Sequence, residues 1–297
     1  MGQGILLPGF PARGMRNGTV INISAQQIPQ EKNINQEIAC NMGIEKHNKA
    51  SEAMCHKGYC EICERETIFR IDGEWLREHY LCSQCLSTPR QRALLHVLNQ
   101  CHPNWRSATI HESSPGSPSS DKLYREGTHY TFSHYYPGIP SGEMGPDGAR
   151  CENLEALSFP DASFEIFITQ DVLEHIFDPS AAFREIARVL VPGGIHIFTV
   201  PRDMSLKESR CRARCLPDGR VEYLEEAVFH GNPVDEKGAL VTWDYGIDLA
   251  EQIFLASGLF TESFLIKDRS LGLDGELLEV FISRKPRLSI PVTHVEK

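Results

Sequence analysis

Apolar positions in the second half of the chain alternate between strand-like runs and a helical period. Residues 164–169 form a short apolar run typical of a strand, and residues 195–200 form another that Pro201 closes. Between them, Asp178 and Pro179 mark a helix start, followed by apolar residues at i, i+3, i+4 and i+7. This spacing predicts a βαβ unit with parallel strands and a right-handed crossover.

Two further strand-like runs lie near the C-terminus, at residues 260–266 and 277–283. The ten residues between them include Gly272, Asp274 and Gly275. This connection is short for a helical crossover, so we expect an antiparallel hairpin. The pattern therefore predicts an α/β domain with a mostly parallel sheet, and its antiparallel ending differs from the usual dinucleotide-binding sheet.

Changes in local composition along the chain also predict its division into domains. The first 55 residues are rich in Gly, Asn, Gln and Lys and lack a sustained apolar period. We interpret them as a flexible tail with one short helix near Gln36–Met42. The predicted units are the tail at 1–55, a cysteine-rich module with a linking helix at 56–103, the α/β domain at 104–286 with an insertion at 201–243, and a C-terminal tail at 287–297.

Composition narrows the class of protein. The chain has 297 residues, of which 41% are hydrophobic and 24% charged, and a net charge of −10. A protein that binds phosphate backbones broadly would carry the opposite charge, so nucleic acid is not an expected partner. No window reaches the roughly 18–20 apolar residues of a spanning helix, and no secretory signal stands at the N-terminus. We therefore expect a cytoplasmic protein whose ten cysteines are thiols or metal ligands.

Four of these cysteines form two C-x-x-C pairs, Cys60/Cys63 and Cys82/Cys85, separated by eighteen residues. The spacing matches zinc sites in which two knuckles supply four thiolates to one tetrahedral ion. Two redox pairs or four idle thiols are the alternatives. Since four protein ligands leave no open position, the predicted Zn²⁺ is structural. In the helix that follows Pro89, we expect Arg90 and Arg92 to face solvent or to lean on the α/β domain.

A resemblance to a known family rests on two segments. Residues 168–175 read Ile-Thr-Gln-Asp-Val-Leu-Glu-His, and residues 188–194 read Arg-Val-Leu-Val-Pro-Gly-Gly. With these two segments in this order, the chain resembles class I S-adenosylmethionine-dependent methyltransferases of type 11. The resemblance covers about Tyr59 to Arg284. The cysteine pairs are similar to zinc knuckles that precede some bacterial members. The resemblance implies a Rossmann-like sheet, S-adenosylmethionine as cofactor and methyl transfer as the reaction.

The resemblance also implies a set of cofactor contacts at the ends of the strands. The family's first strand ends in an acidic residue before a Gly-x-Gly turn; here Glu112 and Gly116 remain, while serines and a proline replace the other glycines. The acidic residue that grips the ribose is absent, and residues 151–154 resemble the turn beside the adenine. The implied contacts are Glu112, Ser113, Gly116, Ser133, Glu152, Asn153, Leu154 and Gln170.

The insertion at 201–243 is expected to cover the acceptor side of the cleft, with a small-molecule, sugar or glycan- or lipid-linked acceptor. Candidate general bases are His230, His175 and Asp171, although an amine or activated carbon acceptor needs none. His175 and His230 could equally be structural, and Glu174 could cap the next segment.

The altered glycine turn leaves a second interpretation, an impaired methyltransferase-like module that recruits a partner through its zinc knuckle. A nicotinamide dehydrogenase is disfavoured because G-x-G-x-x-G is missing. The oligomeric state stays open.

Overall fold

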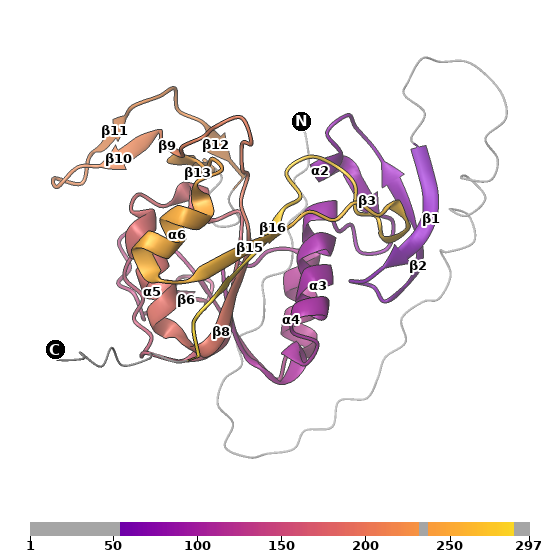
Figure 1. Cartoon of the computed structure of the whole chain (residues 1–297), viewed down its shortest axis with the longest axis horizontal. Coiled ribbons are helices and arrows are strands. Elements are labelled where there is room, and N and C mark those ends of the chain that lie inside the picture. The colour runs from indigo at the N-terminus through magenta and orange to yellow at the C-terminus, as the bar shows by residue number, and fades with distance from the viewer. Residues whose placement is uncertain (1–53, 232–236, 288–297) are drawn as a thin grey trace, which may run out of the picture.

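A seven-stranded sheet organises the protein. The structure is a computed structural model and describes residues 54–231 and 237–287. The strand order is β15-β16-β8-β7-β4-β5-β6 (Figure 1). In that order the strands are Phe260–Phe264, Val280–Arg284, Leu190–Thr199, Phe164–Gln170, Thr109–Ser113, His129–His134 and Arg150–Cys151.

The sheet is mostly parallel, as predicted. Strands β4 to β8 pair in parallel, and β16 pairs antiparallel with both β8 and β15. The predicted βαβ unit is confirmed: β7 and β8 flank helix α5 (Pro179–Val189), where the carboxylate of Asp178 accepts from the backbone N–H of Ala181. Strand β8 starts at Leu190, five residues earlier than predicted, because Leu190 already pairs with Phe164; the Pro-Gly-Gly segment lies in the irregularity between this pair and the next, Ile166 with Ile195.

Helices cover both faces of the sheet and make a three-layer, Rossmann-like fold. Helices α3 (Pro89–Cys101) and α4 (Pro118–Glu126) lie on one face, and α5 and α6 (Leu249–Ser257) lie on the other (Figure 1). Alternation along the strands divides the core between the faces. Ile166, Ile168, Ile195, Ile197, Val280 and Ile282 pack with α3, whereas Phe167, Phe198 and Phe281 pack with α5 and α6.

A small three-stranded sheet precedes the large one and shares its core. It consists of β1 (Met54–Cys60), β2 (Arg65–Ile71) and β3 (Tyr80–Cys82), with a short helix α2 (Leu76–His79) before β3. Phe69 and Tyr80 of this module belong to the same buried cluster as the isoleucines of the large sheet, with α3 between them. The module is therefore packed onto the α/β domain rather than joined by a free linker.

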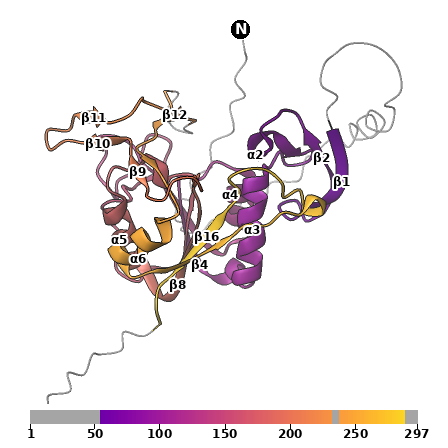
Figure 2. The ribbon, with the colours of Figure 1, turned by 45° about the horizontal axis from the view of Figure 1, so that its top comes forward.

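The predicted C-terminal hairpin is confirmed, but its connection is more than a turn. Residues 265–279 between β15 and β16 run across to the cysteine-rich module, where the short helix η3 (Arg269–Leu271) contacts β1 (Figures 1 and 2). Gly272 in this excursion has φ +69°, and a Cβ there would lie 2.6 Å from the Phe69 ring. The close approach of backbone to ring therefore needs a glycine.

Arg92 joins the module, helix α3 and this excursion. Of its two predicted surroundings, solvent is wrong, because its side chain is 1% exposed, whereas contact with the α/β domain is confirmed through Gly272. Its guanidinium donates to the backbone carbonyls of Tyr80 (2.8 Å), Gly272 (2.7 Å) and Ser87, and lies over the Phe69 ring at 4.6 Å. An arginine is buried here because three carbonyls from separate segments need donors.

The insertion after β8 folds into three small two-stranded sheets, β10-β11, β12-β13 and β14-β9. Its strands are β9 (Arg210–Cys211), β10 (Ala213–Cys215), β11 (Val221–Tyr223), β12 (Phe229–His230), β13 (Ala239–Leu240) and β14 (Trp243–Asp244). The remaining short helices are η1 (Trp105–Ser107) and η2 (Leu173–His175). Figure 2 shows the insertion gathered at one end of the large sheet.

The predicted tails fall mostly outside the described residues, as does the helix expected near Gln36–Met42. Residues 54 and 55, assigned to the N-terminal tail by the sequence, are part of β1. Within the described residues, no helix combines the length and apolarity that crossing a membrane requires.

Replacing Arg92 with methionine should lower the free energy of unfolding by about 2–4 kcal/mol, because it leaves buried carbonyls without donors. Denaturant unfolding measures the change. Arg125→Met, at an exposed position on α4, is the control and should stay within about 0.5 kcal/mol of the parent. A loss no larger for Arg92→Met than for the control would contradict the role given to this side chain.

Candidate functional site

The order of the strands marks where a ligand would bind. From β4 the chain continues through β5 to β6 on one side, and then starts again at β7 on the other side of β4. In open α/β sheets, ligands bind beyond the carboxyl ends of the strands at such a switch point. The turn of residues 114–116 follows β4 there and leads to α4, whose N-cap Ser117 accepts from the N–H of Ser120. Pro118 has no N–H, and the N–H groups of Gly116 and Ser120 donate to Ser120 Oγ (3.4 Å) and Ser117 Oγ (3.2 Å). Ser117 and Ser119 are thus the backbone donors left at this helix start for an anionic ligand group.

Glu112 and Gln170 hold the two strand ends at the switch point together. The carboxylate of Glu112 accepts from Ser120 Oγ (2.8 Å), Tyr130 Oη (2.7 Å) and Gln170 Nε2 (2.7 Å). Gln170 Oε1 accepts from Ser119 Oγ at 3.1 Å. Burial raises the pKa of Glu112 despite these donors. Glu112 and Gln170 lie at the strand ends, where contact residues were predicted. Their polar atoms are bound to protein groups, so they support the turn of residues 114–116 from the protein interior.

Ser133 lies at the end of β5, the expected position, yet its hydroxyl is turned into the protein. Its Oγ is 3.0 Å from Nε2 of His111, a buried histidine whose pKa burial lowers to about 3. The placement does not support the predicted ribose contact. The next residue, His134, has a buried Nδ1 without a hydrogen-bond partner among the described residues. His134 is therefore the better candidate for a contact at this strand end.

The segment predicted to lie beside the adenine is also partly structural. The carboxylate of Glu152 accepts from Arg150 Nε (2.6 Å) and from the backbone N–H of Ser158 (2.8 Å), and it is buried. Leu154 belongs to the core on the α5 side of the sheet. Asn153 is half-buried and accepts from the N–H of Glu155 at 3.0 Å. Of the three, Asn153 remains the candidate for a ligand contact, whereas Ser113, at the end of β4, is buried.

Asp171 links the end of β7 to the cysteine-rich module. Its carboxylate lies 2.6 Å from Nη2 of Arg77 on α2 and 3.1 Å from Nε of Arg90 on α3, and it accepts from Thr199 Oγ1 at 2.8 Å. Burial alone would raise the pKa of Asp171, but Arg90 and Arg77 hold it below its ordinary value. Near neutral pH the carboxylate is ionised and already bound to two arginines and a threonine hydroxyl. This disfavours its predicted role as general base.

The other two predicted bases, His175 and His230, converge on Glu174. His175 Nε2 and His230 Nδ1 each lie 3.8 Å from Glu174 Oε1. Glu174 is 2% exposed, and neither of its carboxylate oxygens makes a hydrogen bond within the described residues. The neighbouring carboxylate raises the pKa of His230. The predicted capping role of Glu174 is wrong, because these oxygens accept from no backbone N–H of the segment.

The insertion holds this cluster in place. The backbone carbonyl of Glu174 accepts from the N–H of Thr242 (2.7 Å), and the carbonyl of Leu173 accepts from Tyr245 Oη (3.0 Å). Glu174 and His230 line a cleft of about 490 Å³. The other lining residues are Pro201, Arg202, Asp203, Met204, Arg212, Val228, Val241, Trp243, Asp244, Tyr245 and Leu277. The insertion thus forms a wall of this cleft next to the end of β7, and its role on the acceptor side stays a prediction.

The four predicted zinc ligands come together at the tips of two turns. Cys60 Sγ lies 3.8 Å from Cys85 Sγ, Cys63 Sγ lies 3.8 Å from Cys82 Sγ, and all four sulfurs are within 4.8 Å of one another. In a tetrahedron with Zn–S bonds of about 2.3 Å, neighbouring sulfurs lie about 3.8 Å apart. The donor set and its spacing therefore fit one zinc ion.

Each knuckle needs a left-handed residue directly after its second cysteine. Glu64 (φ +55°) and Leu86 (φ +61°) fill these positions, and their N–H groups donate to the carbonyls of Cys60 (2.7 Å) and Cys82 (2.9 Å). Neither residue type marks such a position in the sequence, since glycine is the usual choice. The turn geometry comes from the knuckle as a whole.

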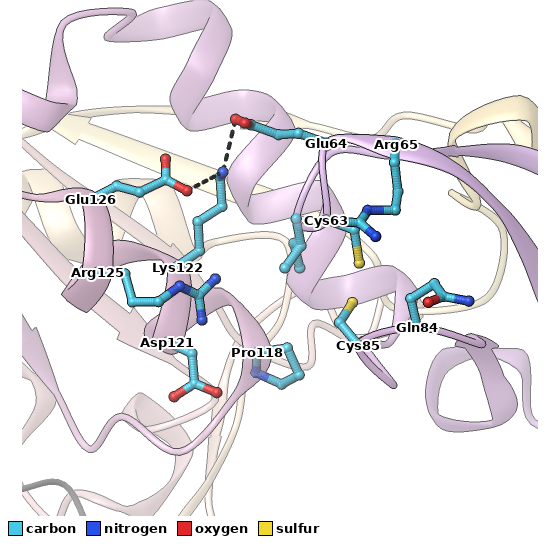
Figure 3. A pocket seen from close by; sticks show the side chains of 11 residues that line it. Cys63, Glu64, Arg65, Gln84, Cys85, Pro118, Asp121, Lys122, Arg125 and Glu126 are labelled. Carbon is cyan, nitrogen blue, oxygen red and sulfur yellow. Dashed lines mark hydrogen bonds and ion pairs between the residues drawn. The ribbon is translucent and has the colours of Figure 1, made fainter. Parts of the chain in front are cut away.

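A second, polar cleft lies between the knuckles and α4 (Figure 3). Lys122, buried on α4, lies at its edge with its ammonium 2.8 Å from Glu64 and 2.6 Å from Glu126. Arg106 contacts the same two carboxylates at 2.9 and 2.7 Å, so the four charges neutralise one another and tie the first knuckle to α4. The cleft is thus a packing seam, and it contains none of the predicted cofactor or acceptor residues.

Comparisons with known proteins point to one class of enzyme. Residues 141–198, which include β6, β7 and most of β8, match a family model described as a methyltransferase domain. The chain is 34% identical over 61 residues to a probable S-adenosylmethionine-dependent methyltransferase of Mycolicibacterium smegmatis, covering 20% of this chain and 24% of that protein. It is also 34% identical over 58 residues to the ubiquinone biosynthesis O-methyltransferase of Parvibaculum lavamentivorans, covering 20% and 22%. The chain thus matches about a quarter of the length of these relatives.

Solved structures are similar at low sequence identity. One is an S-adenosylmethionine-dependent methyltransferase from Mesorhizobium loti, with 16% identity and a TM-score of 0.42, covering 65% of this chain and 98% of that one. Another is 1,6-didemethyltoxoflavin-N1-methyltransferase from Burkholderia thailandensis, with 15% identity and a TM-score of 0.42, covering 66% and 78%.

Replacing Asp171 with asparagine should lower the free energy of unfolding by about 3 kcal/mol, since it leaves two arginines without their buried counter-charge. The pKa of Asp171 is depressed in the folded state, so its contribution is complete above its unfolded pKa of about 3.9 and is lost at lower pH. The difference between the parent and Asp171→Asn should be constant from pH 5 to 8 and shrink below about pH 4. Denaturant unfolding at several pH values measures it.

The control for this variant is Asp161→Asn, which breaks an exposed ion pair with Arg188. This change should cost about 0–1 kcal/mol. Two results would contradict this prediction: an equal loss in the free energy of unfolding for both variants, or a loss for Asp171→Asn that is as large at pH 3 as at pH 7. Either would show that the ion pairs of Asp171 do not cause the loss of stability.

Proposed function

We propose that this chain is an S-adenosylmethionine-dependent methyltransferase. The observation that carries the proposal is the match of the methyltransferase-domain model to residues 141–198, because that segment holds β7 and therefore one side of the switch-point crevice. The mostly parallel sheet, closed by the antiparallel strand β16, supports the same activity. The 34% identical segments belong to named methyltransferases and point in the same direction.

The cofactor would lie across the carboxyl ends of β4, β5 and β7. The turn at Gly116 and the N–H groups of Ser117 and Ser119 would receive its amino-acid end. Glu112 and Gln170 fix this turn from inside. His134 and Asn153 offer polar groups toward the nucleoside end. The sulfonium of S-adenosylmethionine is an activated electrophile, so the protein's task is alignment of the acceptor and exclusion of water rather than covalent catalysis.

The acceptor would enter the cleft between the end of β7 and the insertion. Its walls are mixed, with Trp243 and Tyr245 next to Arg202 and Arg212. Both arginines are paired: Arg202 with Glu279, and Arg212 with Asp244 at 2.8 Å. A small, partly apolar acceptor that carries polar substituents suits such a cleft. His230, which lines the cleft, is the candidate base best placed to contact its reacting group.

The four cysteines would bind one structural Zn²⁺. Their sulfur spacing suits a tetrahedral ion, and four ligands leave no position for a substrate. The ion would fix the ends of β1 and β3 next to α3. Because α2 and α3 supply Arg77 and Arg90 to Asp171, zinc would also steady the turn after β7.

A methyltransferase-like binding module without turnover is the second candidate. It is favoured by the engagement of Ser133 with His111, together with the absence of an acidic residue at the end of β5. Binding of S-adenosylmethionine followed by transfer to no acceptor in a broad screen would favour the module over the enzyme.

Calorimetric titration should detect S-adenosylmethionine and its demethylated product binding with one site per chain. Gly116→Val should weaken both by more than tenfold, because a branched side chain would occupy the space where the backbone approaches the ligand. Thr128→Val, beyond the other end of α4, is the control and should bind as the parent does. Unchanged affinity in Gly116→Val would place the cofactor elsewhere, and no binding to a folded parent would reject the proposed activity.

Metal analysis after gel filtration should find one tightly held zinc per chain. Cys63→Ser should lose it and unfold the module at lower denaturant concentration, since binding free energy is folding free energy at such a site. Cys101→Ser, a thiol outside the cluster, should keep its zinc. A folded parent without zinc, whose four cysteines react freely with a thiol reagent, would reject this site.

A further inference from the structure

The cluster of Glu174, His175 and His230 has the composition of a metal site, and it is separate from the four cysteines. One ligand atom from each residue lies within 4.8 Å of the other two. The two histidine nitrogens are each 3.8 Å from Glu174 Oε1, too far for a hydrogen bond. Metal–ligand bonds of about 2.0–2.2 Å to nitrogen and oxygen would let one ion between these atoms reach both members of each pair.

The protonation of His175 is arranged as a metal ligand requires. Its Nδ1–H donates to the backbone carbonyl of Leu240 at 2.9 Å, and a carbonyl can only accept. The lone pair of the neutral ring is therefore on Nε2, the atom that faces Glu174. Metal-binding histidines almost always donate their other N–H to a carbonyl or carboxylate, which fixes the tautomer and the ring orientation. Leu240 is on β13, whose partner strand β12 carries His230.

The carboxylate of Glu174 supplies an independent sign of a missing partner. The residue is 2% exposed, and both of its oxygens lack a hydrogen bond within residues 54–231 and 237–287. Arg77, the nearby cation, directs its guanidinium to Asp171, Glu78 and the Leu277 carbonyl instead. An unpaired buried carboxylate is costly, so buried charges are generally paired or coordinate a metal.

We propose that Glu174, His175 and His230 bind one divalent transition-metal ion at the edge of the acceptor cleft. Two imidazoles and one carboxylate suit the Mn²⁺ to Zn²⁺ series, whereas Mg²⁺ and Ca²⁺ prefer oxygen ligands throughout. Three protein ligands leave coordination positions open, as in catalytic rather than structural sites. The site differs in this respect from the four-cysteine cluster.

The open positions would be reached from the cleft, because Glu174 and His230 are among its lining residues. An ion there would take an oxygen donor of the bound acceptor, which points to a hydroxyl-bearing acceptor rather than an apolar carbon or an amine. This part of the inference rests on the proposed methyltransferase function, whereas binding of the metal itself does not.

Titration with Co²⁺ tests the site in the full chain loaded with one zinc per chain, which fills the four-cysteine cluster and leaves the second site empty. Zinc is bound more tightly than cobalt, so Co²⁺ should not displace it. We expect one Co²⁺ per chain, with the weak visible absorption of nitrogen and oxygen ligands and without intense thiolate charge-transfer bands. Glu174→Gln keeps the side-chain shape, and His230→Ala changes a partly exposed residue, so both variants should fold.

Each of these variants should bind Co²⁺ more than about 100-fold more weakly, beyond the 10–100-fold typical of outer-shell changes. Asp203→Asn, a carboxylate of the same cleft outside the cluster, should bind it as the parent does. No Co²⁺ bound by the parent, equal binding by Glu174→Gln, or a thiolate spectrum would overturn the inference. Titration of the same samples with S-adenosylmethionine separates the two proposals: cofactor binding without Co²⁺ binding rejects only the metal site, and the reverse rejects only the proposed function.

Discussion

The pairing of Asp171 with two arginines determines how the parts of this protein meet. Asp171 has φ +52° directly after β7, a conformation that non-glycine residues seldom adopt, and Thr199 of β8 holds it from one side. Arg77 and Arg90 hold it from the other side and come from the cysteine-rich module and the helix after it. The turn that carries Glu174 and His175 therefore depends on a segment almost one hundred residues earlier. A change in the module would reach the cleft through this contact.

The remaining junctions of the module strengthen the same dependence. Arg92 connects α3 to the excursion between β15 and β16, and Lys122 connects α4 to the first knuckle. The buried cluster is continuous from Phe69 through α3 to the isoleucines of the sheet. A zinc-filled knuckle would accordingly brace both sides of the switch point. On one side it contacts α4, which follows the turn of residues 114–116, and on the other it holds Asp171, which begins the turn after β7. This arrangement explains why a small module with no open metal position is packed against the domain.

Local patterns predicted the elements well, because their signals are contained in short windows. The apolar runs on either side of α5, the Asp-Pro helix start and the hairpin of β15 and β16 were all identified in this way. The spacing of the cysteine pairs predicted which four sulfurs meet. The register of the strands and the direction of individual side chains were harder to predict from the sequence. Ser133 and His134 were equal candidates at the end of β5; alternation along the strand turns Ser133 toward His111, which leaves His134, with its unpartnered Nδ1 among the described residues, as the candidate. The burial of Arg92 was not evident from the sequence, because one of the carbonyls that it binds, that of Gly272, is 180 positions further along the chain.

The segment Asp171–His175 shows why residue type alone did not separate structure from chemistry. Asp171 is the acidic residue next to the strand and was one of three candidate bases, but its position makes it the partner of two cations. Glu174 looked like a cap, but its carboxylate makes no hydrogen bond within the described residues and has two imidazoles 3.8 Å away. The difference comes from the short helix η2, which turns the chain so that Asp171 faces the arginines while Glu174 and His175 lie next to His230 of the insertion. Since His230 is 55 positions further along the chain, only the fold could bring these three ligands together. A carboxylate that is neutralised by arginine is unsuited to hold an ion, whereas one that faces two imidazoles is suited to it, and this contrast within five residues is the physical basis for assigning the two acids different roles.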